Sequence, residues 1–213
     1  MTTTRRDVSI VTADATLAGE AWLPPDAPGI VLFAHGSGSS RLSPRNRYVA
    51  EQIVGGGIGT LLFDLLTVAE ERRDRLDASL RFDIGLLTER LAGATRWLDA
   101  QDWARSLTRG YFGASTGAAA ALTASVECKV SAIVSRGGRP DLAGAALPMV
   151  TAPTLLIVGS HDPVVIELNS RALAELNCEA RLEIVQGATH LFEEPGTLQQ
   201  VAALATDWFR RWL

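Results

Sequence analysis

Short apolar runs recur along the chain between longer polar or mixed segments. Continuous runs of this kind are typical of strands that are buried on both faces, as in a parallel sheet. They predict strands over residues 30–34, 60–64, 109–112, 130–135 and 154–158, with a last strand over residues 181–185. Two earlier runs, residues 8–11 and 17–23, flank the polar residues 12–16 and predict an antiparallel hairpin at the N-terminus.

Segments with helical periodicity separate these strands. Residues 82–100 predict a long helix whose inner face carries Leu86, Leu87, Leu91, Ala94 and Leu98. Residues 197–213 predict a closing helix whose inner face carries Val201, Leu204, Ala205, Trp208 and Trp212. Other helices are expected from the Ser43-Pro44 pair to residues 55–57, from near Gly117, and over residues 163–176, with a short helical piece toward residue 147. The charged residues 70–77 predict a surface loop.

Strands that alternate with helices indicate an α/β fold with a doubly wound, mostly parallel sheet, to which the N-terminal hairpin adds antiparallel strands. The 213 residues fit a single domain, residues 1–213, with a core on both sides of the sheet. No repeat, linker or separate lid insertion is evident in the sequence.

Composition and charge exclude several classes of protein. The chain is 47% hydrophobic and 21% charged, as in globular domains, and its formal charge of −4 provides no basic surface for nucleic acid. Cys128 and Cys178 are too few and too unpatterned for a disulfide scaffold or a zinc site. The polar N-terminus has no signal-peptide core, and no run approaches the roughly 20 apolar residues of a membrane span. We therefore expect a cytoplasmic protein without a metal site that binds neither nucleic acid nor membrane.

The residues Gly113-Ala114-Ser115-Thr116-Gly117 form a G-x-S-x-G motif between an apolar run and a helix rich in alanine. This is the sequence form of a nucleophile elbow, in which a strained strand-to-helix turn presents a serine hydroxyl. Glycines on both sides let the strand and the helix pack closely. The motif makes Ser115 a candidate nucleophile.

A serine nucleophile needs a base, and the base needs an orienting acid. Asp162 and His190 follow later strands, so the order Ser115, Asp162, His190 is that of α/β-hydrolases. Asp162 also precedes a proline, so a helix N-cap is the structural alternative for it, and Asp141 is a rival acid. His35 is expected to hold the loop after its own strand through backbone hydrogen bonds.

Two further groups complete the candidate site. The backbone N–H groups of Thr116 and Ser37 are expected to form an oxyanion hole, because the glycines beside Ser37 allow a close approach to a substrate oxygen.

Arginines follow two strand ends. Arg45, Arg136 and Arg139 are candidates for binding an anionic substrate group. Alternatively, arginines in these loops form salt bridges to acids such as Asp64 or Asp83.

Four segments carry a family resemblance that covers almost the whole chain. They are His35-Gly36-Ser37-Gly38, the elbow at residues 113–117, Gly159-Ser160-His161-Asp162 and Gly187-Ala188-Thr189-His190. With them the chain resembles the dienelactone hydrolase-like family of the α/β-hydrolases, and the resemblance implies a triad of Ser115, Asp162 and His190 without a cofactor. True dienelactone hydrolases use a cysteine nucleophile, so the substrate does not carry over. The chain is more similar to small bacterial relatives, some of which resemble domains attached to phosphoribosyltransferases.

The leading hypothesis is a serine hydrolase that cleaves a small ester or thioester through an acyl-enzyme on Ser115. The missing lid insertion argues against long-chain lipid substrates. A non-catalytic binding or scaffolding module on the same fold is the alternative from another class, and peptidase or acyltransferase chemistry on the same triad is a third. The sequence leaves monomer and homodimer open.

Overall fold

An eight-stranded sheet forms the middle layer of the computed structural model, which describes residues 2–213. The strands run in the order β1-β2-β4-β3-β5-β6-β7-β8. Their bounds are β1 (Thr4–Val11), β2 (Thr16–Leu23), β3 (Gly29–Ala34), β4 (Gly59–Phe63), β5 (Thr108–Ala114), β6 (Ala132–Arg136), β7 (Thr154–Gly159) and β8 (Ala180–Val185). The six strands from β3 to β8 are parallel to one another, while β2 is antiparallel to both β1 and β4. The predicted hairpin and the mostly parallel sheet are confirmed.

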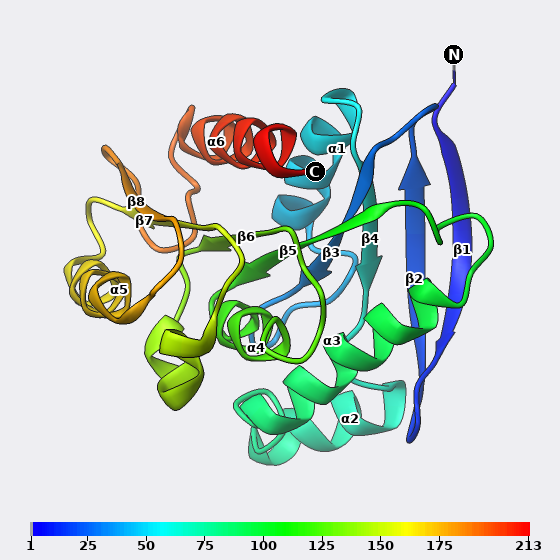
Figure 1. Ribbon diagram of the computed structural model, residues 1–213. Coiled ribbons are helices and arrows are strands. Elements are labelled where there is room, and N and C mark those ends of the chain that lie inside the picture. The colour runs from blue at the N-terminus through cyan, green and yellow to red at the C-terminus, as the bar shows by residue number, and fades with distance from the viewer. Residues whose placement is uncertain (1) are drawn as a thin grey trace.

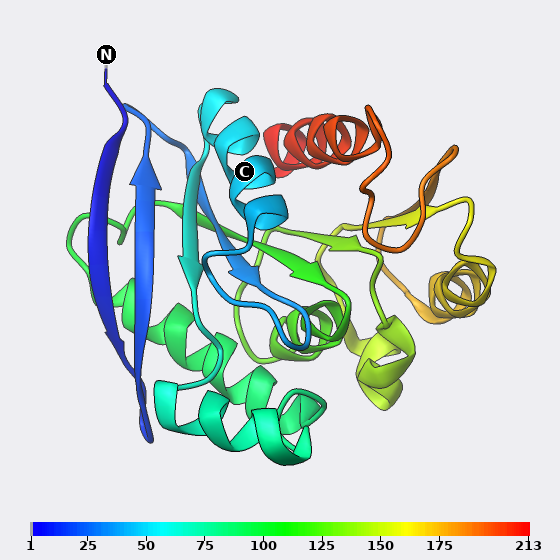
Figure 2. The same cartoon turned by 180° about the vertical axis from the view of Figure 1, so that it is seen from behind.

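Helices cover both faces of this sheet (Figures 1 and 2). The face seen at the top of Figure 1 carries α1 (Pro44–Gly55) and α6 (Thr197–Trp212), which contact each other. The opposite face carries α3 (Ile84–Asp99), α4 (Thr116–Ala124), the 3₁₀-helical segment η1 (Pro140–Met149) and α5 (Pro163–Glu175), and α2 (Val68–Asp77) lies beside α3. This three-layer arrangement is that of a doubly wound α/β sheet.

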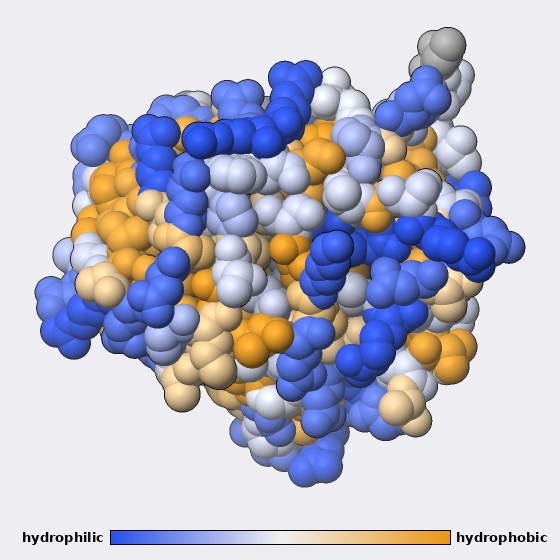
Figure 3. All heavy atoms as spheres, viewed as in Figure 1, coloured by the Kyte–Doolittle hydropathy of each residue, from blue (hydrophilic) through white to orange (hydrophobic). Residues whose placement is uncertain are grey.

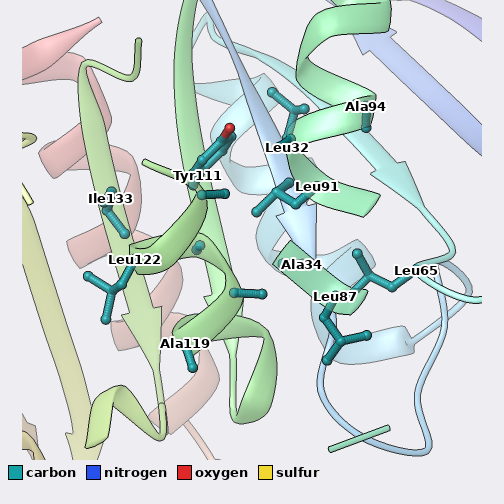
Figure 4. Close-up of a cluster of buried hydrophobic side chains, with 14 of the residues drawn as sticks. Leu32, Ala34, Leu65, Leu87, Leu91, Ala94, Tyr111, Ala119, Leu122 and Ile133 are labelled. Atoms are coloured by element: carbon teal, nitrogen blue, oxygen red, sulfur yellow. The ribbon is translucent and has the colours of Figure 1, made fainter. Parts of the chain in front are cut away.

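The two faces of the sheet bury separate apolar clusters. On the side of α3 and α4, side chains from these helices meet those of β3, β5 and β6 (Figure 4). The hydroxyl of Tyr111 in this cluster forms a hydrogen bond with the Thr95 hydroxyl at 2.7 Å. On the side of α1 and α6, the rings of Phe33 and Phe112 stack with their centroids 4.7 Å apart. Because both faces of the parallel strands are buried, those strands appear in the sequence as continuous apolar runs.

The predicted surface loop at residues 70–77 is wrong, because these residues belong to α2. Thr67 and Glu70 form a capping box at its start, in which the Thr67 side chain accepts from the Glu70 N–H and the Glu70 carboxylate accepts from the Thr67 N–H. Asp74 is buried, whereas Leu76 is 89% exposed. The helix therefore lacks the apolar face that would have marked it in the sequence, and its capping box was the available signal.

The other predicted helices are present, with ends that differ from the predictions by a few residues. Ser43 caps α1 through a bond from the Asn46 N–H at 3.4 Å, and Asp83 caps α3. In α6, the fully buried Phe209 joins Val201 and Ala205 inside, while Leu204 and Trp212 are only partly buried.

Exposed apolar side chains are distributed over several elements. Leu76 on α2 and Val164 on α5 are the most exposed of the large ones. On the face shown in Figure 3, hydrophilic and hydrophobic residues are interspersed. In a doubly wound sheet, a functional site lies at the carboxyl ends of the parallel strands, where loops and helix N-termini meet.

Candidate active site

Ser115 lies in the sharp turn between β5 and α4. Its backbone has φ 51° and ψ −121°, a strained left-handed conformation for a residue other than glycine. The flanking glycines are required by close packing, since a Cβ atom at Gly113 would lie 2.4 Å from the Cα of Ala118, and one at Gly117 would lie 2.1 Å from the carbonyl oxygen of Ala34. The segment has the geometry of a nucleophile elbow.

Asp162 and His190 meet at the same edge of the sheet, although they are 28 residues apart. The Nδ1 atom of His190 lies 2.6 Å from Oδ2 of Asp162. Asp162 occupies the N-cap position of α5, with Pro163 as the first helical residue, but its side chain makes no capping hydrogen bond. Its carboxylate is turned to the histidine instead, which is how an acid orients an imidazole.

The loop that carries His190 also lies close to the candidate nucleophile. A Cβ atom at Gly137 would lie 3.5 Å from Cε1 of His190, and Gly137 follows Arg136, whose carbonyl accepts the Ser115 N–H at 3.2 Å. Within residues 2–213 no hydrogen bond joins the Ser115 hydroxyl to His190. The structure thus brings the acid and the histidine into contact and places both beside the strand end next to the elbow.

Glu194 holds the His190 loop in place. Its carboxylate accepts the Thr189 N–H at 3.1 Å, and this hydrogen bonding lowers the pKa of Glu194. Phe192 adopts a positive φ of 55° and is only 1% exposed, so its ring fixes the loop to the core. These two residues position the histidine, and the sequence did not point to them.

The loop after β3 lies against the elbow. A Cβ atom at Gly36 would lie 3.0 Å from the Cβ of Ser115. In the described part of the chain, the N–H groups of Ser37 and Thr116 donate to no protein acceptor. Both amides therefore remain available to an oxygen of a ligand.

His35 anchors this loop. Its Nδ1 lies 3.0 Å from the carbonyl oxygen of Gly36, and its Nε2 accepts the Leu65 N–H at 3.1 Å. This pattern requires a neutral ring with the proton on Nδ1. Burial lowers the pKa of His35, which keeps the ring neutral. The predicted structural role of His35 is confirmed.

A cavity of about 230 Å³ opens beside the loop. Its walls are residues 35–40, Thr116, Leu87 and several residues of α2 and its flanks. The charged groups in the walls are paired. Arg41 pairs with Asp64, Arg75 with Glu71 at 2.7 Å, and Arg81 with Asp74 at 2.7 Å. The cavity therefore carries no large net charge.

The pair of Asp74 and Arg81 was not predicted from the sequence, because residues 70–77, which contain Asp74, were expected to form a surface loop. Burial would raise the pKa of Asp74, but hydrogen bonds from Arg81 and from the Leu80 N–H lower it. The guanidinium of Arg81 is fixed by this carboxylate, and its Nη1 lies 3.6 Å from the position of a Cβ at Gly38. The pair thus holds one wall of the cavity against the glycine loop.

The three arginines predicted to bind substrate differ in their partners. Arg139 donates to both carboxylate oxygens of Asp141, at 2.8 and 2.7 Å. The carboxylate of Asp141, the rival acid, is therefore engaged in an ion pair. Arg45 donates to Glu193 at 2.9 Å. Arg136 is 8% exposed, and its side chain forms no ion pair or hydrogen bond with the described residues. The salt-bridge alternative is right for Arg41, which pairs with Asp64.

Within residues 2–213, no group of three or more histidine, cysteine, aspartate or glutamate side chains is arranged to hold a metal ion. None of the helices in the described part of the chain combines the length and apolar character needed to cross a lipid bilayer.

Comparison with known proteins places this geometry in a family. No family model matches the chain. A "Putative phosphoribosyl transferase" of Mycobacterium tuberculosis is 58% identical over 205 residues, which are 95% of this chain but only 45% of that protein. The chain thus spans less than half the length of these curated relatives.

Solved structures cover the chain more fully. An esterase from Pyrococcus furiosus, 19% identical, has the same fold with a TM-score of 0.80 over 99% of this chain and 93% of its own. The crystal structure of a dienelactone hydrolase from Anabaena variabilis is 55% identical, with a TM-score of 0.98 over 99% of both chains. This chain belongs to the dienelactone hydrolase-like family of the α/β-hydrolase superfamily.

Proposed function

We propose that the protein is a serine hydrolase that cleaves a small ester or thioester. The observation that carries the proposal is the 2.6 Å contact between His190 and Asp162, at the sheet edge where Ser115 occupies a strained elbow. A hydroxyl in such a turn becomes a useful nucleophile only with a base and an acid of this kind. The cavity of about 230 Å³ beside the loop of Ser37 favours a small substrate.

In the proposed reaction, the Ser115 oxygen attacks the substrate carbonyl while Nε2 of His190 takes its proton. Asp162 accepts the hydrogen bond from Nδ1 and stabilises the imidazolium. The N–H groups of Thr116 and Ser37 bind the oxyanion. His190 then protonates the departing alcohol or thiol, which leaves an acyl group on Ser115. Water, deprotonated by His190, attacks that acyl group and releases the acid.

The name of the mycobacterial relatives refers to proteins more than twice as long as the region matched here. Hydrolysis is proposed for this chain because the residues that would carry it lie within its own fold. An esterase, a peptidase and an acyltransferase can share this triad. Assays with an anilide substrate, and with an ester in the presence of an alcohol acceptor, separate these three activities.

The proposal is tested with a fluorophosphonate probe and an activated short-chain ester. Parent protein should be labelled at Ser115, and Ser115→Ala should lose both the label and at least about 10⁴-fold in turnover. His190→Asn should lose labelling as well. Ser170→Ala, which removes an exposed hydroxyl on α5, is the matched control and should behave as the parent. Folded Ser115→Ala protein with parental turnover would refute the mechanism, and a parent that resists labelling would favour a non-catalytic binding module.

A further inference from the structure

Arg136 is a buried cation without a counter-charge. It is the last residue of β6, where it pairs in the sheet with Ala114 and Ile157, and it is 8% exposed. Its Nη1 is fully buried without a hydrogen-bond partner, and within residues 2–213 the guanidinium contacts no carboxylate. Removing a charge from water without pairing it is costly, so such a residue requires a specific explanation.

The surroundings of Arg136 add positive charge. Arg45 lies in the first turn of α1, and its Nε is also buried without a partner. Burial, and then the charge of Arg45, lower the pKa of Arg136 to about 10. The first turn of α1 contains no acidic residue that would offset the positive end of the helix dipole. Two guanidinium groups and a helix N-terminus thus lie together.

The contacts that could balance this charge are weak. The Phe112 ring lies 5.9 Å from the Arg136 guanidinium, at the far limit of a cation–π contact, and offers no hydrogen-bond acceptor. Glu193 accepts from Arg45 at 2.9 Å, but its side chain is 61% exposed. Glu193 thus pairs with Arg45, and among the described residues no acid pairs with Arg136, so the two guanidinium groups keep a net positive charge.

We propose that Arg136 and Arg45 form a binding site for an oxyanion, either a carboxylate or a phosphate group. A planar guanidinium binds both groups through paired hydrogen bonds, which would satisfy the donors that lack partners here. The Glu193 carboxylate already binds Arg45, and because the Glu193 side chain is exposed to solvent, a ligand can displace it. The Ser115 N–H donates to the Arg136 carbonyl at 3.2 Å, so the backbone of Arg136 adjoins the elbow. The anion is either the acidic end of a substrate or a separate ion.

Binding is tested without turnover, so the result does not depend on the proposed hydrolase activity. Thermal unfolding is followed with sodium phosphate and, separately, sodium acetate, against sodium chloride at equal ionic strength. At a concentration tenfold above Kd, the parent should gain about 3–6 °C in Tm. Arg136→Met should lose this gain, and Glu193→Gln should bind the anion about two- to fivefold more tightly because a competing acceptor is removed. Arg171→Met, at an exposed ion pair on α5, should respond as the parent.

The thermal data also separate this role from a purely structural one. Without added anion, Arg136→Met should melt at the parental temperature or above, because methionine removes an unpaired buried charge. A Tm loss in that variant, with an unchanged response to phosphate, would overturn the proposal. So would a parent that responds to neither phosphate nor acetate. Where Arg136→Met does not fold, Arg45→Met must weaken the response for the proposal to stand.

Once binding is shown, two esters of equal length identify the source of the anion. A lower kcat/KM in Arg136→Met for the acidic ester, but not for the neutral one, assigns the site to the substrate. Equal effects on both esters, together with inhibition or activation of the parent by phosphate, assign it to a separate ion. Both results support the oxyanion site.

Discussion

The loop after β3 packs closely against the candidate nucleophile Ser115 at Gly36. A Cβ atom there would lie 3.0 Å from the Cβ of Ser115 and 3.1 Å from the carbonyl oxygen of Ala114. Gly36 does not have a positive φ, so its backbone accepts alanine and only the lack of space opposes the substitution. Gly36→Ala is therefore a graded way to move the loop of Ser37 away from the elbow.

The size of the effect follows from these distances. Carbon atoms in contact normally lie about 3.5–4.0 Å apart, so the loop must retreat by roughly 0.5 Å. Overpacking of this kind costs about 1–3 kcal/mol, and each kcal/mol lowers Tm by roughly 2–4 °C in a domain of this size. A displacement of about 1 Å can cost about 10²-fold in rate, so half of it predicts a loss of about tenfold. The loss should fall on kcat, because the oxyanion contacts form in the transition state.

Steady-state kinetics with an activated ester, together with thermal unfolding, test this prediction. Gly55→Ala is the control, since a Cβ there has no neighbour within 4 Å and the residue ends helix α1. That variant should keep the parental kcat with equal or higher stability. If Gly36→Ala lowers Tm as expected while kcat stays at the parental value, the loop of Ser37 does not form the oxyanion site.

Three further predictions concern the elbow, the loop anchor and the acid. Gly117→Ala should prevent recovery of folded protein, because its Cβ would lie 2.1 Å from the Ala34 carbonyl oxygen; circular dichroism checks this. Burial lowers the pKa of His35, so the unfolded chain gains a proton near pH 6.5 that the folded protein does not bind. The free energy of unfolding should thus decrease as the pH drops below 6.5, by at most about 1.4 kcal/mol per pH unit. His35→Asn should lack this part of the pH dependence when urea unfolding is compared at pH 7.5 and pH 5.5. Asp162→Asn should reduce kcat by about 10⁴-fold with a parental melting profile, because the amide no longer holds the His190 tautomer.

The contact between Asp162 and His190 could be predicted because it depends on topology. Parallel strands bring their carboxyl ends to one edge, so the order of Ser115, Asp162 and His190 along the chain already places them together. The same reasoning could not find the supports of this contact. Glu194 reaches the Thr189 N–H through the local fold of one loop, and nothing in the spacing of the two residues requires it.

Arginine partners show the same limit. The sequence offered Arg45, Arg136 and Arg139 as equivalent candidates, yet Arg139 pairs with a neighbour two residues away and Arg45 with a glutamate 148 residues away. The choice depends on which acids the tertiary structure brings within reach. Helix α2 is different, since its capping box is present in the sequence. The helix was not predicted because its many charged residues suggested a loop.

Charge balance differs on the two sides of the elbow, and this difference bears on the substrate. In the cavity beside Gly38 each arginine of the walls faces an acid, so an uncharged group is accommodated there at little electrostatic cost. On the other side, the Arg136 guanidinium pairs with no acid among the described residues. If both proposals hold and the anion belongs to the substrate, the preferred ester has one neutral end and one acidic end, with its carbonyl between them at Ser115. Arg136→Met should then cleave a neutral ester of the same length at the parental rate. That result would show that Arg136 recognises the acidic end of the substrate and takes no part in cleaving the ester bond.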